Sequence, residues 1–389
     1  MFWSRLTKLK KPTFYRILFW TIVFFIGENA IFNIVMQLEW PLIDAKNDSH
    51  VLVVSDPQLI DRNCYSVFVT SRAWISDLFM SRAFSKLMRH SKPDSVVFLG
   101  DLLDGGREWE DVEYNIEMNR FHWIFGHKKS GNDRIFHPGN HDIGIGNTLV
   151  VKAAERFKAT YDTELNLTRT IQNVTFVSIN SLGLVEIDQN PLGNETVEFI
   201  EKFQSPSNNT IILLSHIPLY RPDNTYCGPL RSLFARKTIN QYRGYQYQNL
   251  LAQSTSEWLI EKLKPSLILS GDDHDICHYS HSGIPEETVA TFNCLQGTLF
   301  PGYLMLTING SNFKYSHGYL PSAILAIYIY LMLGFIVVII RVYQLMRAHN
   351  YLPLPFTSNR TGFHQQSVII EVVTPLIIYL VIFFISFNF

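Results

Sequence analysis

The sequence predicts an α/β domain held between apolar segments that can cross a membrane. In the middle of the chain, short apolar runs rich in β-branched residues alternate with helical patterns. Near both ends lie long apolar segments with almost no charge. Metal-binding residue types follow several of the apolar runs directly. The 33 basic and 34 acidic residues are mixed along the chain, which gives no reason to expect nucleic-acid binding.

Three apolar segments are long enough to span a bilayer, at 17–38, 320–340 and 368–387. We expect the first to be an uncleaved signal anchor, because no small-residue cleavage pattern follows it. Residues 1–16 and the loop 341–367 carry basic residues and no acid, which places both in the cytosol. Residues 40–319 then form a lumenal domain, and residues 388–389 return to the lumen.

Glycosylation sequons and cysteines agree with this topology. The six Asn-x-Ser/Thr sequons of the lumenal segment are at Asn47, Asn166, Asn173, Asn194, Asn208 and Asn309. A seventh, at Asn359, lies in the predicted cytosolic loop, where it could not be glycosylated. All four cysteines are lumenal, in a compartment that permits disulfides. They allow three pairings.

The lumenal segment alternates between predicted strands and helices. We expect strands at 50–56, 94–101, 134–142, 174–181, 210–216 and 266–275. We expect helices at 72–90, 109–126, 148–160, 195–203 and 254–263. Residues 288–317 alternate in a way that suits two or three antiparallel strands. This order predicts a parallel or mixed sheet covered by helices.

Polar side chains follow five of these strands immediately. They are Asp56, Asp101, the run 139–142, His216 and the cluster 271–275. The carboxyl ends of strands in an α/β sheet line up along one edge, which is where ligands bind. One such aspartate is more often a helix cap or a turn former, but five segments together predict a shared site.

These segments resemble a known family. "SDPQ", "GDLLDGG", "GNHD", "SHIPLYR" and "SGDDHD" match, in order, the five blocks of the calcineurin-like metallophosphoesterases. The resemblance covers nearly all of the lumenal domain and implies a four-layer α-β-β-α sandwich. With the three spans, the chain looks most like the ER and Golgi group of Cdc1, Ted1 and metallophosphoesterase-1, which removes ethanolamine phosphate from the mannoses of GPI anchors.

The resemblance implies two divalent metal ions. The first would be held by Asp56, Gln58, Asp101 and His274. The second would be held by Asp101, Asn140, His216 and Asp272. Asp101 suits the bridging position, because a carboxylate has two oxygens and a negative charge. Gln58 and Asp272 stand where the family usually has histidine, which shifts the expected metal from zinc towards manganese, with iron and magnesium as further alternatives.

The same resemblance assigns the acid–base chemistry to His141. It would lie over the phosphoryl group and protonate the leaving oxygen, with Asp142 fixing its tautomer. We expect Asp104 and Asp275 to support the ligands by hydrogen bonding, and Asp273 to face solvent.

Other residues of these loops have less defined roles. Arg107 and Arg221 follow metal loops and could bind phosphate or a sugar, with salt bridges across the cleft rim as the alternative. Among the three cysteine pairings we expect Cys227–Cys277, because each cysteine closely follows a loop assigned to the metal site.

The leading functional hypothesis is a membrane-anchored two-metal phosphodiesterase of the ER or Golgi. Its substrate would be a GPI-anchored protein or GPI glycolipid, and anchoring enzyme and substrate in one bilayer of lipid raises their effective concentration. The residues alone support metal-dependent phosphoester hydrolysis. The alternatives are a lumenal phosphomonoesterase, a phospholipid head-group diesterase, or a catalytically degenerate cargo or folding factor for GPI-anchored proteins.

Overall fold

A computed structural model provides the structure of the protein. It describes residues 18, 21–22, 31–44, 46–61, 67–126, 133–187, 190–205, 209–231 and 237–350. The chain divides into two compact units. One covers Met36–Leu320, and the other combines Met1–Val35 with Pro321–Phe389 and contains helix α9 (Ala323–Asn350).

Several predicted segments fall outside the described residues. These are 1–16, 368–387 and 388–389, together with parts of 17–38 and 341–367. Among the helices that the structure does describe, none combines the length and the apolar character needed to cross a membrane.

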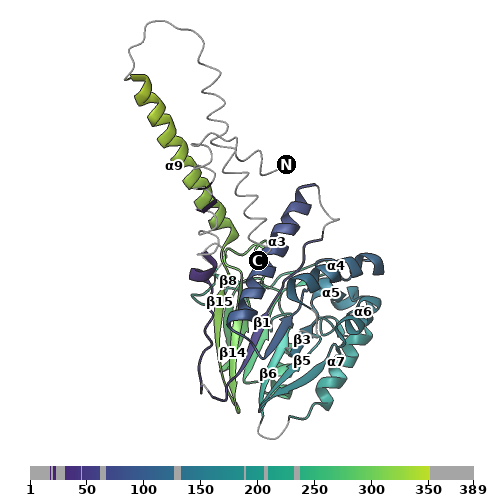
Figure 1. Ribbon diagram of the computed structural model, residues 1–389. Coiled ribbons are helices and arrows are strands. Elements are labelled where there is room, and N and C mark those ends of the chain that lie inside the picture. The colour runs from purple at the N-terminus through teal and green to yellow at the C-terminus, as the bar shows by residue number, and fades with distance from the viewer. Residues whose placement is uncertain are drawn as a thin grey trace. The chain divides into compact units, whose positions relative to one another are not determined.

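The first sheet of the larger unit has five strands in the order β15-β14-β1-β2-β3 (Figure 1). Their bounds are Asn312–Tyr319, Gly302–Asn309, Ser49–Val54, Ser95–Leu99 and Asp133–His137. β1, β2 and β3 run parallel, whereas β14 pairs antiparallel with both β1 and β15. The apolar run "SVVFL" of β2 is buried along its whole length, as expected of a strand covered on both faces.

The second sheet has six strands in the order β12-β13-β11-β6-β5-β4. Their bounds are Cys277–His281, Ile284–Thr288, Leu267–Ser270, Thr210–Ser215, Val174–Ser178 and Leu167–Ile171. The four central strands are parallel, and the outer strands β12 and β4 pair antiparallel with their neighbours.

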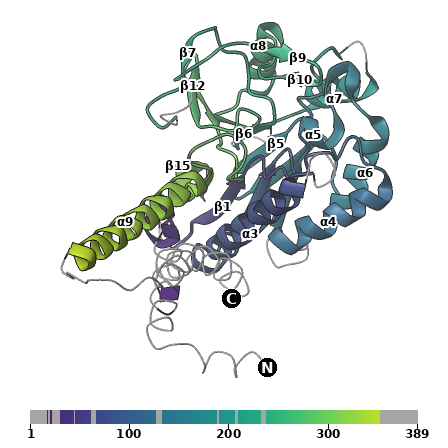
Figure 2. The ribbon, with the colours of Figure 1, turned by 90° about the horizontal axis from the view of Figure 1, so that it is seen from above.

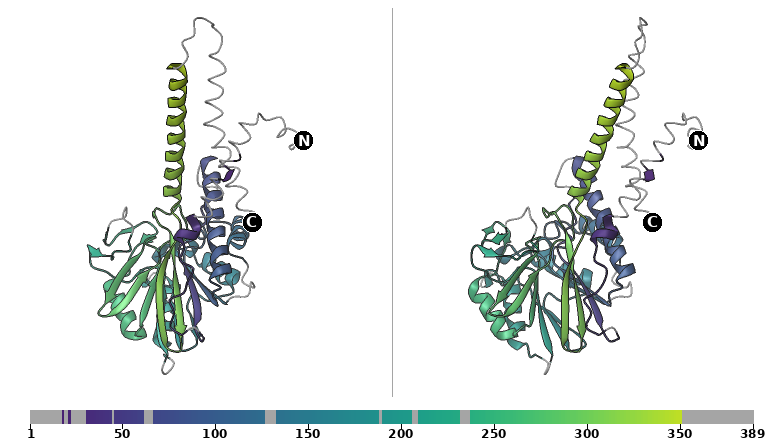
Figure 3. Two further views of the ribbon diagram at one scale, coloured as in Figure 1. Left: turned by 60° about the vertical axis from the view of Figure 1, so that its left-hand side comes forward. Right: turned by 90° about the vertical axis from the view of Figure 1, so that its left-hand side faces the viewer.

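The two sheets pack face to face (Figure 3). Val53 and Leu99 of the first sheet share one buried apolar cluster with Phe176, Leu214 and Leu269 of the second. Successive strand residues point to opposite faces, so each strand gives every other side chain to this inner core. The sheets are therefore the two inner layers of the domain.

Helices cover the outer face of the first sheet. They are α3 (Val67–His90), α4 (Asp111–Phe125) and α6 (Val151–Tyr161). Phe98 of β2 contacts Phe84 of α3 and Phe121 of α4, with ring centroids 6.1 Å and 5.6 Å apart. Phe136 of β3 stacks on Tyr161 of α6 at 4.5 Å. Figure 2 shows α3 and α4 along this side of the domain.

The outer layer of the second sheet consists of α7 (Pro191–Lys202) and α8 (Gln253–Leu263), which contact each other. Leu213 and Ile268 are buried but alternate with the residues of the inner core, so they point towards this layer. The predicted α/β sandwich with helices outside two sheets is thereby confirmed.

The structure confirms antiparallel strands at the end of the domain. Within 288–317, β14 and most of β15 form an antiparallel hairpin, which gives two of the two or three strands expected there. Strands β4, β12 and β13 were missed, because "LTRTI", "CHYSH" and "IPEET" are too polar to resemble buried strands.

Four two-residue strands were also missed. Strands β7 (Thr225–Tyr226) and β8 (Thr238–Ile239) pair in one hairpin, and β9 (Arg243–Gly244) and β10 (Tyr247–Gln248) in another. They lie in an insertion between β6 and α8.

Candidate metal centre

The predicted ligands meet at the carboxyl ends of the parallel strands. Asp56 lies two residues beyond β1, Asp101 two beyond β2, His216 directly after β6, and Asp272 two beyond β11. All four are buried, with exposed fractions of 0%, 2%, 0% and 7%. Ligand atoms of Asp56, Asp101 and His216 lie within 4.8 Å of one another. The structure thus brings together residues from four distant segments.

The His216 ring lies at the centre of this cluster. Its Nε2 is 3.2 Å from Asn140 Oδ1, 3.4 Å from Asp101 Oδ1 and 3.7 Å from Asp272 Oδ1. Its Nδ1 is 3.0 Å from the carbonyl oxygen of Leu99. A proton on Nδ1 would be donated to that carbonyl, which leaves the Nε2 lone pair aimed at the cluster, as in metal-binding histidines.

His274 has a similar arrangement near Asp56. Its Nδ1 lies 3.1 Å from the carbonyl oxygen of Gln296, and its Nε2 lies 3.9 Å from Asp56 Oδ1. Gln58 donates from Nε2 to Asp104 Oδ1 at 3.0 Å, and its own Oε1 is buried without a partner. The amide is therefore anchored by its nitrogen, with its oxygen free to act as a ligand.

Five of the predicted ligands adopt the left-handed backbone conformation. The φ values of Asp56, Gln58, Asp101, Asp272 and His274 are +47°, +33°, +47°, +63° and +62°. This conformation is uncommon outside glycine and often marks a functional site. Its concentration at these residues indicates that the loops are shaped by the site rather than by local preference.

Two glycines allow the loops to approach so closely. A Cβ on Gly100 would lie 2.1 Å from His216 Nδ1, and one on Gly139 would lie 2.1 Å from Asp101 Oδ1. Each glycine directly precedes a predicted ligand. The glycines of "GD" and "GN" therefore let neighbouring loops place their ligands side by side.

The electrostatics of the cluster fit a divalent cation. Burial, followed by the charges of Asp101 and Asp56, raises the pKa of Asp272 well above its ordinary value, and Asp272 Oδ2 is buried without a partner. Burial also raises the pKa of Asp56. Burial would raise the pKa of Asp101 too, but His216 and His141 lower it. Carboxylate and amide oxygens with imidazole nitrogens are ligands for divalent metals, which would neutralise this buried charge.

Comparison with known families agrees with this geometry. The family described as calcineurin-like phosphoesterase matches residues 49–276, which is more than half of the chain and includes every predicted ligand. The chain belongs to the calcineurin-like phosphoesterase family. It is accordingly a metal-dependent phosphoesterase, and divalent ions are its cofactors.

Two curated relatives are similar to this phosphoesterase over long segments. Cell division control protein 1 of Saccharomyces cerevisiae is 34% identical over 251 residues, which cover 63% of this chain and 50% of that protein. Metallophosphoesterase 1 of Danio rerio is 28% identical over 371 residues, covering 88% of this chain and 94% of that protein. The chain therefore spans about half the length of the yeast relative.

Among solved structures, GAP50, the anchor in the inner membrane complex of Plasmodium, is 12% identical with a TM-score of 0.45, covering 72% of this chain and 86% of that one.

The structure corrects the partner of His141 in the phosphoesterase site. His141 Nδ1 lies 2.6 Å from the carbonyl oxygen of Asp104 and 3.2 Å from its carboxylate Oδ1. The prediction that Asp142 orients this ring is wrong. The Asp142 carboxylate instead accepts backbone N–H groups of Leu102, Leu103 and Gly139.

The electrostatic environment favours a protonated His141. Burial lowers its pKa, but the charge of Asp101 and the hydrogen bond with Asp104 outweigh burial and raise the pKa to about 9. The Nε2 atom lies 3.1 Å from Gln58 Nε2, beside the predicted ligands. His141 is therefore placed to donate a proton at neutral pH.

The two arginines predicted to contact substrate differ in the structure. Arg221 is fully buried, forms an ion pair with Glu286 at 3.1 Å and donates to Thr288 Oγ1 at 2.8 Å. Of the two alternatives for Arg221, the structure therefore supports a salt bridge and not substrate binding, because the buried pair with Glu286 keeps the side chain away from solvent. Arg107 donates to the carbonyl oxygen of Asn140 at 2.8 Å, which stabilises the ligand loop.

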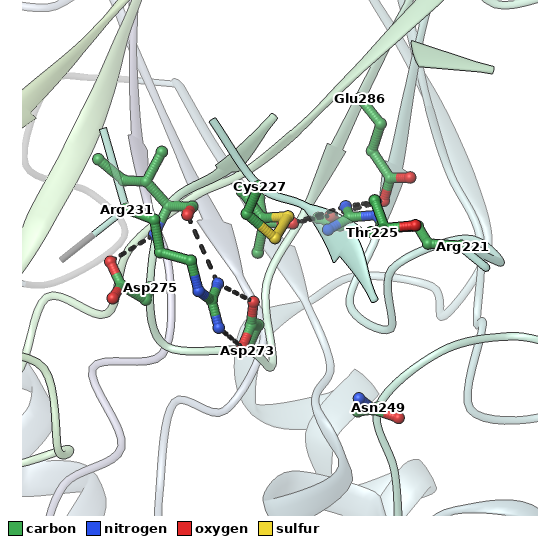
Figure 4. Close-up of a disulfide and its surroundings, with 12 residues drawn as sticks. Arg221, Thr225, Cys227, Arg231, Asn249, Asp273, Asp275 and Glu286 are labelled. Carbon is green, nitrogen blue, oxygen red and sulfur yellow. Dashed lines mark hydrogen bonds and ion pairs between the residues drawn. A yellow bond between two sulfur atoms is a disulfide. The ribbon is translucent and has the colours of Figure 1, made fainter. Parts of the chain in front are cut away.

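The loop after β11 is fastened to the insertion by two links (Figure 4). Cys227 and Cys277 form a disulfide, the pair expected from the sequence. Arg231 pairs with both carboxylate oxygens of Asp273, so the prediction that Asp273 faces solvent without a role is wrong. Asp275 accepts the N–H of Ile276 at 2.8 Å, and it contributes to the charge environment of Arg231.

Three residues that support the site were missed by the sequence analysis. His137 is fully buried, and its Nε2 accepts the backbone N–H of His216 at 2.9 Å. Burial lowers its pKa to about 3, so this ring stays neutral. Thr291 donates to the carbonyl oxygen of Asp56, and Asn293 to that of Gln58. Only His137 had a sequence signal, because it ends a strand directly before "PGNHD".

The sequons fall into distinct groups. Asn47, Asn173 and Asn194 are exposed, and Asn208 lies outside the described residues. Asn166 donates to Thr196 and accepts from Asn180, and Asn309 donates to Asp48. The exposed group therefore contains the sequons best placed to carry glycans in the folded protein.

Proposed function

We propose that this phosphoesterase is a membrane-attached phosphodiesterase of the ER or Golgi that uses two divalent ions, with manganese preferred. Its reaction would be hydrolysis of the diester that joins ethanolamine phosphate to a mannose of a GPI anchor. The observation that carries the proposal is the buried cluster of Asp56, Asp101, Asn140, His216 and Asp272, with His141 beside it.

The ligands divide between two centres. Asp56, Gln58 and His274 would hold one ion together with the shared Asp101, and Asn140, His216 and Asp272 would hold the other with the same Asp101. When bound, the ions would supply Lewis acidity at the phosphoryl oxygens and a water nucleophile at neutral pH. A carboxylate at position 272 and an amide at position 58 favour oxygen-preferring ions such as Mn²⁺ over Zn²⁺.

The residues around the ions would provide orientation and a proton. The backbone N–H of His141 donates to Asp101 Oδ1 at 2.8 Å. This contact fixes the backbone of the proton donor His141 relative to the ligands. Asp104 holds the imidazole through Nδ1, so Nε2 would face the leaving oxygen and protonate it as the P–O bond breaks. An alkoxide is a poor leaving group, so this proton matters for a sugar diester.

Support for the substrate and location comes from the sequence. The chain resembles the ER and Golgi group that acts on GPI anchors, and it is similar to Metallophosphoesterase 1 along nearly its full length. The apolar segments 17–38, 320–340 and 368–387 would attach the domain to the bilayer that holds the lipid-linked substrate.

The test is release of ethanolamine phosphate from a GPI glycan by the purified full-length protein in detergent, with Mn²⁺ added and products measured by mass spectrometry. Wild type should release it, and Asp101→Asn and His141→Ala should lose more than about 100-fold in rate. The exposed Asp111 pairs with Arg156 away from the ligands, so Asp111→Asn is the matched control and should match wild type.

Other outcomes would decide against parts of the proposal. Equal rates in wild type and both site variants would overturn the catalytic assignment. Hydrolysis of a phosphomonoester or a phospholipid head group, but not of the GPI glycan, would keep the metal chemistry and overturn the substrate.

A further inference from the structure

The insertion between β6 and α8 carries an aromatic and amide-rich hairpin. Residues 240–249 read "NQYRGYQYQN", with three tyrosines, three glutamines and two asparagines and no aliphatic side chain. Strands β9 and β10 form the hairpin, near α8 in Figure 2. Neither the metal ligands nor the catalytic chemistry above uses it.

The hairpin lies at the metal centre. The carbonyl oxygen of Gln246 accepts Asn140 Nδ2, with 3.4 Å between the two atoms. Tyr247 is partly buried, and after burial itself the charge of Asp272 is the largest influence that raises its pKa, followed by Asp273, Asp56 and Asp101. Tyr247 directly follows Gln246, so the backbone contact with Asn140 places its half-buried ring next to the ligand loop.

A second ring extends this surface towards solvent. The Tyr242 and Tyr247 rings are 5.8 Å apart at an angle of 46°, and the Tyr242 side chain is 64% exposed. The two adjacent rings form a wall that runs from the half-buried Tyr247, next to the Gln246–Asn140 contact, to the exposed Tyr242. Such a wall offers apolar faces with polar hydroxyls at the edges.

The wall is held by fixed contacts. Asn249 is buried, and it accepts the N–H of Tyr242 at 2.7 Å and donates to the carbonyl oxygen of Asn240 at 2.9 Å. Arg243 of the hairpin forms an ion pair with Glu186, which lies outside the insertion. The Cys227–Cys277 disulfide and the Arg231–Asp273 pair join the same insertion to the loop that carries Asp272. A rigid surface can discriminate between substrates with little ordering cost.

We propose that Tyr242, backed by Tyr247, is the specificity wall against which the glycosyl group of the phosphodiester packs. This inference rests on the proposed function, because it takes a sugar diester as substrate. A pyranose ring has an apolar face of C–H groups and a rim of hydroxyls. Tyrosine rings match the face, and the amides of the hairpin match the hydroxyls. A phosphoryl group at the metal ligands would leave its sugar at this wall.

The experiment compares two diesters that share one leaving-group chemistry. One joins ethanolamine phosphate to methyl mannoside, and the other joins it to ethanol. Purified full-length protein in detergent with Mn²⁺ is used for both. Tyr242→Ala should raise KM for the mannoside diester about tenfold or more with kcat within twofold, and should leave kcat/KM for the ethyl diester within twofold.

Two further variants separate recognition from folding. Tyr242→Phe keeps the ring and should restore KM for the mannoside diester. Tyr226 lies on β7 of the same insertion and is 58% exposed, so Tyr226→Ala should behave as wild type on both substrates.

The outcomes distinguish this inference from the proposed function. If Tyr242→Ala lowers kcat/KM equally for both diesters, or for neither, the wall is not a sugar site. The proposed reaction would still stand. Equal kcat/KM of wild type on both diesters would overturn the wall in the same way. If the Mn²⁺-loaded wild type hydrolyses neither diester, the proposed function fails and the inference fails with it.

Discussion

At the scale of single residues, two neighbouring carboxylates divide the work around His141. Asp104 contacts the imidazole Nδ1, and Asp142 binds three backbone N–H groups that belong to both the 101–106 and 139–142 loops. The first would therefore affect the proton donor, and the second the shape of the site.

Asp104→Asn should lower kcat by about 10- to 100-fold on an alkyl diester, because the ring loses the negative charge that favours its protonated form while the backbone contact to Nδ1 remains. A diester with a p-nitrophenolate leaving group needs little protonation, so its kcat should fall much less. Steady-state kinetics on both substrates measure the difference. Asp142→Asn is the comparison. It should lower the unfolding temperature, and any change in kcat should be the same for both substrates. A loss of equal size on both substrates would argue against Asp104 acting through the proton.

The sequence predicted which residues gather at the site but not these contacts. The motif blocks placed the predicted ligands after strands, and the strands do end at one edge. The partner of His141 was missed because Asp142 stands at the third position of the short helix α5 (Asn140–Ile143). A carboxylate there turns back to the N-terminal N–H of its own helix, so adjacency in sequence did not mean contact.

At the scale of elements, the approach of β2 to the loop after β6 depends on Gly100. Its φ is +91°, and a Cβ would lie 2.1 Å from His216 Nδ1. The strand end and the ligand cannot both keep their places if a side chain is added.

Gly100→Ala should lower the rate more than about 100-fold and reduce bound metal, because His216 must move. Gly310 is a matched control, since its φ is +59° but a Cβ there would meet open space. Gly310→Ala should cost only about 1–2 kcal/mol from backbone strain and keep full metal content. The measurements are the metal content and the thermal unfolding of both variants. A metal content equal to that of wild type in Gly100→Ala would contradict the role assigned to Gly100.

Strand β13 carries two buried acids on opposite faces. Glu286 pairs with Arg221 and with His281, whereas Glu287 contacts His278, His317 and Tyr315. The pairs stabilise β13 and the edge strand β12 beside it, which the sequence could not reveal because polar strands near a sheet edge resemble loops.

Glu286→Gln should lower the free energy of unfolding by about 3–5 kcal/mol at pH 7, because it leaves Arg221 buried and unpaired. Burial raises the pKa of Glu286, but Arg221 and His281 outweigh burial and hold it below the ordinary value of 4.5. The stabilisation is therefore present above pH 4.5 and lost as pH falls through the folded-state pKa. The difference in unfolding temperature between variant and wild type should begin to narrow as pH falls below 4.5 and should close only below the folded-state pKa of Glu286. Glu164→Gln, at an exposed ion pair, should match wild type throughout, and a gap that does not narrow in acid would refute the assignment.

At the scale of the whole molecule, an inner pair of sheets places the ligands, and an insertion contacts the loops that carry them. Strand–helix alternation predicted the sheets, because buried parallel strands have continuous apolar runs. It did not predict the insertion, whose two-residue strands have too few residues to show a period. The insertion is joined to the ligand loop after β11 by Cys227–Cys277 and by Arg231–Asp273, and to the 139–142 loop by the contact of Asn140 with Gln246.

The disulfide should therefore couple global stability to metal binding. Cys227 and Cys277 are 50 residues apart in sequence, and closing a loop of that length stabilises the folded state by about 4 kcal/mol in the chain-entropy treatment. The double variant Cys227→Ser, Cys277→Ser should lose most of this, seen as a lower unfolding temperature. It should also need several-fold more Mn²⁺ for half-maximal activity, because the loop that carries Asp272 and His274 is less restrained.

Cys294 provides the control, since it is buried with a free thiol. Cys294→Ser should lower stability without changing the Mn²⁺ requirement. Saturating Mn²⁺ should return the activity of the double variant towards wild type, because metal that binds only the ordered loop shifts the loop's equilibrium by mass action. An unchanged Mn²⁺ requirement in the double variant would mean that the sheets alone order the ligand loop. The insertion would then act only on the substrate side of the site.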